Sequence, residues 1–343
     1  MNLYEEKNKK IYYEELHIRH LNLLIDLKNY QFNNWFYKMA IINTFDDLKI
    51  FLSNLEKNKY KCIIAIKNKK IIGYVYTNPI NNKKTCLKIN SPEIIGDFIE
   101  ISKRDLILEL IKKSITNNNL NTSNWIINAD INDEELISIS RELGFQPLQE
   151  IILWKKIGNK GLHSNNYLNE LNNFEKINKS NIKKFLNFIR ANENIIIRNT
   201  IDLDYKDILK RSDNKCGMIL NKEEILFGIL KDSSYENKKV YSLIRGLLWN
   251  NDLNQVLNNL INDLIKKDND IIFKSYSHDK LLNKLLSDLN LNEIKHELIL
   301  VRNTLIRRDL KSVNKFNRSW ESLMEKINPQ GNAYPSPFPS ETK

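Results

Sequence analysis

The chain has 343 residues, of which 41% are apolar and 28% are charged, and these fractions are typical of a soluble globular protein. No apolar run reaches the length of a membrane span, and the N-terminal MNLYEEKNKK lacks the apolar stretch of a signal peptide, so we expect a cytoplasmic protein without a membrane segment. Its three cysteines, Cys62, Cys86 and Cys216, have neither the even number nor the spacing of a disulfide framework or a zinc site.

The net charge of +11 is dispersed along the chain. The lysines and arginines gather in short clusters at 7–10, 67–70, 112–113 and 307–308. No aromatic residues are interleaved with these clusters, as they would be in a surface that binds single-stranded nucleic acid. We therefore expect a solvated basic surface and no nucleic-acid partner.

The first half of the chain shows alternating strand and helix patterns. The clearest signal is KCIIAIKNKKIIGYVYT, in which two β-branched runs flank Asn68, a residue that tolerates the left-handed turn conformation, and Gly73 indicates a bulge. The predicted elements, in chain order, are a strand at His17–Leu21, helices at Leu23–Tyr37 and Thr44–Leu55, the hairpin, a strand at Ile94–Ile101, a helix at Lys103–Ile115, a strand at Trp125–Ala129, a helix at Asp133–Leu143 and a strand at Glu150–Trp154.

The second half begins again after a polar stretch. We predict a linker at 158–173, because these residues are rich in Asn and lack any apolar period. The next predicted elements are a strand at Phe174–Ile177, a helix at Ser180–Arg190, a hairpin over GMILNKEEILFGILKD, a strand at Val240–Trp249 and a helix at Asp252–Ile265. Residues 311–343 are predicted to form a polar helix and a proline-rich tail without regular structure.

The two halves resemble each other. When Trp125–Trp154 is placed beside Ile271–Val301, Asp133 meets Asp279, Leu143 meets Leu289 and Phe145 meets Leu291. A repeated unit of this size is a whole domain. We therefore predict a first repeat at 1–157 and a second repeat at 174–310, in a monomer whose domains are arranged as a pseudo-dimer.

The order of elements resembles the GNAT superfamily of N-acetyltransferases. The stretch DEELISISRELGFQPLQEIILWKK carries the resemblance most clearly, since Leu143-Gly144-Phe145 matches the Leu-Gly-Phe of that superfamily. In the second repeat Leu289-Asn290-Leu291 stands in its place. The implied fold class is α/β (α+β), with two tandem GNAT-like domains that each contain a mixed, mostly antiparallel sheet flanked by helices.

The resemblance also implies acetyl-CoA, or another acyl-CoA, bound at the start of the helix that follows the fourth strand. Backbone N–H groups at a helix start suit a pyrophosphate. The matching residues of the first repeat are Ile101, Ser102, Lys103 and Arg104. This loop lacks the glycines of the family motif, as does Asn250-Asn251-Asp252 in the second repeat, and an ordinary capped helix remains an alternative for both.

The catalytic residues are less clearly indicated. The family places a tyrosine acid three residues before Leu-Gly-Phe, where this chain has Ser140 and, in the second repeat, Leu286. Candidates for a base are Glu93, Asp97 and Glu100, each of which could equally be a solvated strand-edge residue. Arg245 could bind an acidic substrate or extend to solvent.

Three hypotheses of function follow. The first is an acyl-CoA-dependent N-acetyltransferase that transfers the acetyl group directly to an amine of a small molecule or a protein. The second is a non-catalytic tandem binding module, which the missing glycines and tyrosine favour. The third is a Fem-type aminoacyl transferase, against which the dispersed charge counts.

Overall fold

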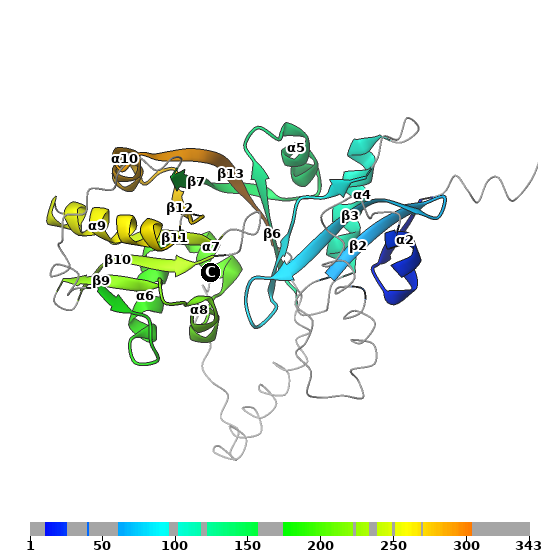
Figure 1. The fold of residues 1–343 in the computed structure, drawn as a ribbon. Coiled ribbons are helices and arrows are strands. Elements are labelled where there is room, and N and C mark those ends of the chain that lie inside the picture. The colour runs from blue at the N-terminus through cyan, green and yellow to red at the C-terminus, as the bar shows by residue number, and fades with distance from the viewer. Residues whose placement is uncertain are drawn as a thin grey trace, which may run out of the picture. The chain divides into compact units, whose positions relative to one another are not determined.

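The computed structural model describes residues 11–25, 40, 61–95, 102–117, 122–156, 174–221, 224–232, 239–248, 251–268 and 270–303 (Figure 1). The first repeat contains β1 (Tyr12–Glu15), a 3-10 helix (Ile18–His20), α2 (Leu21–Ile25), β2 (Lys61–Lys67), β3 (Lys70–Pro79), β4 (Cys86–Ile89), β5 (Glu93–Ile94), α4 (Lys103–Thr116), β6 (Asn124–Asp130), α5 (Glu134–Glu142) and β7 (Gln146–Lys156). The second contains β8 (Phe174–Lys176), α6 (Ile182–Asn192), α7 (Ile195–Ile201), α8 (Tyr205–Arg211), β9 (Gly217–Asn221), β10 (Glu224–Lys231), β11 (Val240–Arg245), α9 (Asn251–Lys267), β12 (Ile272–Tyr276), α10 (Lys280–Asp288) and β13 (Leu291–Asn303).

All thirteen described strands belong to one sheet, in the order β1-β2-β3-β4-β6-β13-β7-β12-β11-β10-β9-β8, with β5 paired to β3. Among the described strands, β4 with β6 and β11 with β12 are parallel pairs, and every other pair is antiparallel. The predicted mixed, mostly antiparallel sheet flanked by helices is therefore confirmed. The boundaries at 157, 173 and 310 stay predictions, because those residues lie outside the described part of the chain.

The two repeats exchange their last strands. β13 of the second repeat pairs with β6 of the first through Val301↔Ile126, and on its other edge with β7 through Glu297↔Ile151. β7 in turn pairs with β12 of the second repeat. The two half-sheets thus form one continuous hydrogen-bonded layer, an arrangement that the sequence did not predict.

The local geometry of the two repeats is the same where the sequences align. Asp133 caps α5 by accepting a hydrogen bond from Leu136 N at 3.0 Å, and Asp279 caps α10 by accepting one from Leu282 N at 3.3 Å. Both helices are followed by a left-handed residue, Gly144 with φ 85° and Asn290 with φ 56°. Gly and Asn are the residues that adopt this conformation most readily, so the C-terminal caps are equivalent despite the change from Leu-Gly-Phe.

The predicted hairpin at 61–77 is confirmed. Its turn is made by Asn68 and Lys69, which both have positive φ, as a two-residue type I′ turn requires. Gly73 faces Ala65 next to a register shift, and a Cβ at this position would lie 3.1 Å from Glu93 O. The glycine therefore lets the short strand β5 approach β3 closely.

The structure differs from prediction in several elements. Residues 18–25 are helical, and the first strand lies earlier, at Tyr12–Glu15. The fourth main strand is β4, because Cys86–Ile89 pairs in parallel with β6 whereas Glu93–Ile94 pairs with β3. Helices α7 and α8 were not predicted. The predicted helix at 44–55 and the tail at 311–343 lie outside the described residues, as does residue 249 at the end of a predicted strand.

Helices cover both faces of the sheet. On one face, α4 and α5 pack on the first repeat through Leu106 and Ile139, and α9 and α10 pack on the second through Leu257 and Leu286. On the opposite face, α6 packs on β9, β10 and β11, and α7 places Ile197 against first-repeat and β13 side chains. Figure 1 shows α9 and α6 on the two sides of β9, β10 and β11.

Candidate active site in an inter-repeat cavity

A cavity of about 290 Å³ lies where α6, α7 and α8 cover the sheet, on the face opposite α9 and α10. Both repeats contribute to it. Its polar lining residues are Asn78, Lys88, Asn128, Glu193, Arg211, Lys231, Asp232, Ser242, Lys274, Ser275 and Tyr276. A cavity that holds this many ionisable side chains beside an apolar core is a candidate ligand site.

An ion pair lies at the second-repeat side of the cavity. The Lys274 ammonium contacts the Asp232 carboxylate, and Ser242 Oγ donates a hydrogen bond to Asp232 Oδ2 at 3.3 Å. Burial alone would raise the pKa of Asp232, but the charges of Lys274, Arg211 and Lys88 and the hydrogen bond from Lys274 together hold it well below its usual range. Asp232 is therefore ionised throughout the neutral range.

Three further side chains line the cavity without such partners. Within the described residues, the Lys88 ammonium, the Glu193 carboxylate and the Tyr276 hydroxyl make no hydrogen bond or ion pair, although the Tyr276 ring stacks on His278 with centroids 5.5 Å apart. All three side chains are partly exposed, and all three line the cavity. A ligand in the cavity can therefore contact them without displacing a protein partner among the described residues.

The surroundings of these groups change their protonation. Burial raises the pKa of Glu193 to about 7 and Asp232 adds to the rise, while Lys274 and Arg211 oppose it. Burial lowers the pKa of Lys88, although Asp232 and Glu297 oppose the shift. Burial, with the negative charges of Glu193 and Asp232, raises the pKa of Tyr276. At neutral pH, Glu193 can thus accept or release a proton, and Tyr276 remains a proton donor.

The ion pair belongs to the second repeat alone. Strand pairing aligns Asn78, Lys88 and Ile126 of the first repeat with Asp232, Val240 and Ile272 of the second.

By this alignment Asn78, Asn90 and Asn128 correspond to Asp232, Ser242 and Lys274. In the first repeat Asn90 Nδ2 donates to Asn78 Oδ1 at 2.9 Å, and Asn128 Nδ2 donates to Glu297 Oε2 at 3.1 Å. Three amides thus replace the ion pair and its hydroxyl, and the two repeats are chemically unequal.

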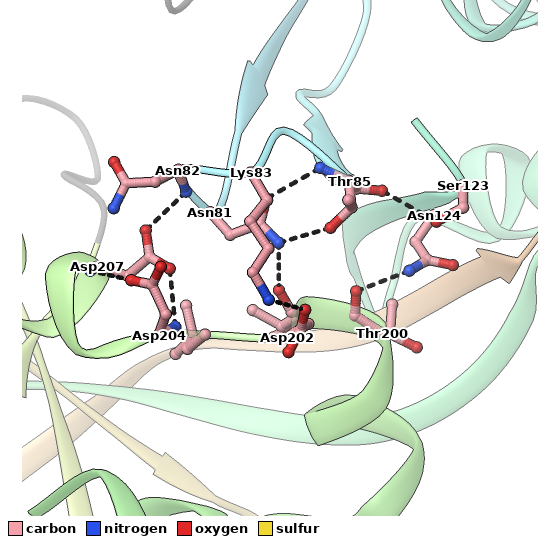
Figure 2. A network of polar contacts seen from close by, with 12 residues as sticks. Asn81, Asn82, Lys83, Thr85, Ser123, Asn124, Thr200, Asp202, Asp204 and Asp207 are labelled. Carbon is pink, nitrogen blue, oxygen red and sulfur yellow. Dashed lines mark hydrogen bonds and ion pairs between the residues drawn. The ribbon is translucent and has the colours of Figure 1, made fainter. Parts of the chain in front are cut away.

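A polar network, which we call the latch, joins the β3–β4 loop of the first repeat to α7 and α8 of the second (Figure 2). Asn81 Nδ2 donates to Ile201 O at 2.7 Å, Asn82 N donates to Asp207 Oδ1 at 2.7 Å, and Lys83 Nζ lies 2.6 Å from Asp202 Oδ2. Close by, Arg211 donates to Ile80 O at 2.7 Å. Ile80, Ile201 and Arg211 line the cavity, so the latch holds one of its walls in place.

The predicted site residues of the first repeat lie elsewhere. Ser102 caps α4 by accepting from Asp105 N, Lys103 Nζ lies 3.7 Å from Glu135 Oε2, and Arg104 donates to Glu142 Oε2 at 2.6 Å. These contacts are on the surface, and none of the three residues lines the cavity. Asp97, Glu100 and Ile101 lie outside the described residues.

Other candidate residues have structural partners. Glu93 accepts a short hydrogen bond from the Tyr74 hydroxyl, whose pKa is raised by burial and by Glu93. Arg245 Nε lies 2.8 Å from Asp279 Oδ1 in an ion pair that joins β11 to the start of α10. The two positions at which the GNAT resemblance implies a tyrosine acid hold Ser140 and Leu286. Both side chains are fully buried.

The sequence analysis did not identify the residues that line the cavity. A signal was present in two strands, because Lys88 interrupts the apolar run CLKI and Lys274 interrupts IFKSY, each at an inward-facing position. No such signal marks Glu193, which follows α6 in a polar stretch. Its position depends on how α6 and α7 cover the sheet.

The described part of the chain contains no cluster of three or more His, Cys, Asp or Glu side chains that could hold a metal ion. Its helices are all too short or too polar to span a membrane. The three cysteines are buried free thiols.

No protein-family model matches this chain, and no curated protein matches it in sequence. Solved structures with a similar arrangement include a tandem GNAT protein from the clavulanic acid biosynthesis pathway, at 6% identity, 86% coverage of this chain, 98% of that chain and a TM-score of 0.47. A GNAT-family acetyltransferase from Colwellia psychrerythraea matches at 12% identity, 86% and 100% coverage and a TM-score of 0.44. A GCN5-related N-acetyltransferase from Sphaerobacter thermophilus matches at 6% identity, 75% and 85% coverage and a TM-score of 0.47. At these values the similarity concerns the fold alone.

Proposed function

We propose that the protein is an acyl-CoA-dependent N-acyltransferase whose amine acceptor binds in the inter-repeat cavity. The observation that carries this proposal is that one cavity contains both a candidate base and a candidate acid. Glu193 can accept a proton near neutral pH, Tyr276 stays protonated and can donate, and neither makes a hydrogen bond or an ion pair through its side chain with a described residue. Acyl transfer from a thioester to an amine needs both a base and an acid.

The residues beside the cavity fit an acyl thioester. Pairing of the parallel strands β11 and β12 ends at Ser242–Lys274, and Leu243, Ile244, Ser275 and Tyr276 beyond that point line the cavity. Leu247, which follows β11, is 90% exposed and offers an apolar contact at the same end. When bound, an acyl-CoA supplies an activated carbonyl with a thiolate leaving group.

The side chains of the cavity then have distinct roles. The Glu193 carboxylate accepts the proton of an ammonium group and leaves the nitrogen lone pair free for attack. The Tyr276 hydroxyl, which its raised pKa keeps protonated, donates to the departing thiolate and relays to it the second proton that the attacking nitrogen releases. The ionised Asp232–Lys274 pair fixes the local field and does not change its protonation.

We place transfer in the second repeat, whereas the sequence analysis favoured a cofactor at Ile101–Arg104 of the first. Four residues that follow the last hydrogen-bonded pair of β11 and β12 line the cavity. Among the described residues that follow the last pair of β4 and β6, Asn128 alone does so.

A non-catalytic binding module is the second candidate. The absence of glycine from both predicted pyrophosphate loops and of tyrosine from positions 140 and 286 favours it.

The test is calorimetric titration of the full chain with acetyl-CoA, followed by an assay of thiol release with a panel of amines. We expect acetyl-CoA to bind and an amine to release free thiol. We expect Tyr276→Phe to lower kcat about 100-fold while acetyl-CoA affinity changes less than about twofold, as for loss of a general acid.

A Lys103→Ala/Arg104→Ala variant is the matched control for the first repeat. If it abolishes acetyl-CoA binding, the cofactor belongs to the first repeat and our placement is wrong. If neither acetyl-CoA nor longer acyl-CoAs bind to the unmodified protein, the acyltransferase function is wrong and the protein is a non-catalytic binding module.

A further inference from the structure

The cavity holds two charges of opposite sign that the described part of the protein leaves uncompensated. Lys88 projects from β4 of the first repeat, and Glu193 follows α6 of the second. Neither takes part in a hydrogen bond or an ion pair through its side chain with a described residue. Both side chains are partly exposed and line the cavity, so a ligand that supplies the opposite charge can contact each of them.

The other charged residues of the cavity have partners. Lys274 is paired with Asp232, Lys231 Nζ lies 3.9 Å from Asp213 Oδ2, and Arg211 donates to Ile80 O. Lys88 and Glu193 both feel the electrostatic influence of Asp232 and Lys274, which places that ion pair near both of them. Lys88 and Glu193 are thus the cation and the anion of the lining that no described residue engages, and a ligand with one carboxylate and one ammonium complements both.

The size and the walls of the cavity restrict the ligand further. At about 290 Å³ the cavity lies at the lower end of the roughly 300–1,000 Å³ that is typical of small-molecule sites. Ile126, Ile197, Leu230 and Ile299 supply apolar wall between the polar groups. An amino acid with an apolar side chain suits both the size and the walls.

We propose that the cavity binds a free amino acid with an apolar side chain, with its carboxylate on Lys88 and its amine on Glu193. As a binding site this stands on the cavity alone, and as the acyl acceptor site it rests on the proposed function. The amine then lies next to the Glu193 carboxylate, which accepts its proton in the proposed reaction. The carboxylate is held by the opposite repeat, so recognition requires both repeats.

The test uses calorimetric titration of the full chain, without acyl-CoA, with three probes of nearly the same shape. L-Leucine carries both charges, L-leucinamide lacks the carboxylate, and L-2-hydroxy-4-methylpentanoate lacks the ammonium. We expect L-leucine to bind at least ten times more tightly than either of the others. L-Valine, L-methionine and L-phenylalanine are titrated as well, to cover the side-chain size.

Variants assign each contact. Lys88→Met should abolish the preference for L-leucine over L-leucinamide, and Glu193→Gln should abolish the preference over L-2-hydroxy-4-methylpentanoate. Lys112→Met, which changes an exposed lysine of α4, is the matched control and should bind all three probes as the unmodified protein does. The proposal is overturned if none of the four amino acids binds, or if L-leucine and L-leucinamide bind equally well to the unmodified protein.

Adding acetyl-CoA separates this proposal from the proposed function. If an amino acid binds but no thiol is released, the amino-acid site stands and the acyltransferase function fails. If other amines are acylated while no amino acid binds, the function stands and the amino-acid site fails.

Discussion

At the scale of single residues, the cavity combines a satisfied ion pair with unsatisfied charges. Asp232 and Lys274 stabilise each other, with side chains only 23% and 19% exposed. Lys88 has no such partner, and its lowered pKa reflects a burial that opposes its charged form. A residue that costs stability and has no structural partner is typical of a functional site.

We predict opposite effects for two matched substitutions. Lys88→Met removes an unpaired charge and should raise Tm, by about 2–4 °C for each kcal/mol gained. Lys274→Met leaves the Asp232 carboxylate without its ammonium and should destabilise the fold by about 3–5 kcal/mol. Thermal unfolding followed by circular dichroism measures both. A lower Tm for Lys88→Met would mean that Lys88 supports the fold and is not held ready for a ligand.

At the scale of elements, the latch explains how a loop of one repeat positions helices of the other. Asn81 is only 3% exposed, and its side chain accepts from Thr85 N at 3.1 Å and donates to Thr85 Oγ1 and Ile201 O. Lys83 of the same loop makes an ion pair with Asp202 in which both side chains are nearly half exposed. Buried hydrogen bonds contribute more to stability than exposed ion pairs do.

We therefore predict that Asn81→Ala destabilises the protein by about 1–3 kcal/mol, because it leaves Thr85 N–H and Ile201 C=O without this partner. Lys83→Ala should cost less than about 1 kcal/mol. Urea unfolding of the two variants is the measurement. Equal losses would show that the buried amide does not hold the loop against α7.

Most elements of the fold could be predicted from the sequence. The hairpin at 61–77 depends on local chemistry, which the sequence displays directly. The similarity of the repeats pairs Asp133 with Asp279, and the structure shows that both are helix caps. Helices α7 and α8 have only seven residues each and are separated by Asp202 in a left-handed conformation, so neither produces a clear helical period. β4 has only four residues, and the alternation in so short a strand is weak.

The cavity could not be predicted in the same way. Lys88 and Lys274 each interrupt an apolar strand, and either could have been flagged. Lys88 and Lys274 line the same cavity because the exchange of β7 and β13 brings the two half-sheets together. Such a long-range pairing leaves no mark in either strand's own sequence.

At the scale of the whole molecule, the exchanged strands make the repeats dependent on each other. Without β13, both β6 and β7 would expose an unpaired edge. Trp154 in β7 is 2% exposed and donates to Ser275 Oγ in β12 at 2.8 Å, so the end of the first repeat lies in the core of the second.

We accordingly predict that the two repeats unfold together. Urea unfolding should give one transition that is the same by tryptophan fluorescence and by far-ultraviolet circular dichroism. Hydrogen exchange should show similar opening free energies in β3 and β10, which lie in different repeats. Two separate transitions, one for each repeat, would contradict the shared sheet.

The most direct test of the whole account is the pH dependence of thiol release for the unmodified protein and for Glu193→Gln, with acetyl-CoA and the amino acid that binds best. Because the ionised form of Glu193 accepts the proton, kcat/KM of the unmodified protein should rise with pH up to about 7 and then level off. Glu193→Gln should be about 100-fold slower and should lose that rise. A variant with the rate and the pH profile of the unmodified protein would show that the chemistry takes place outside this cavity.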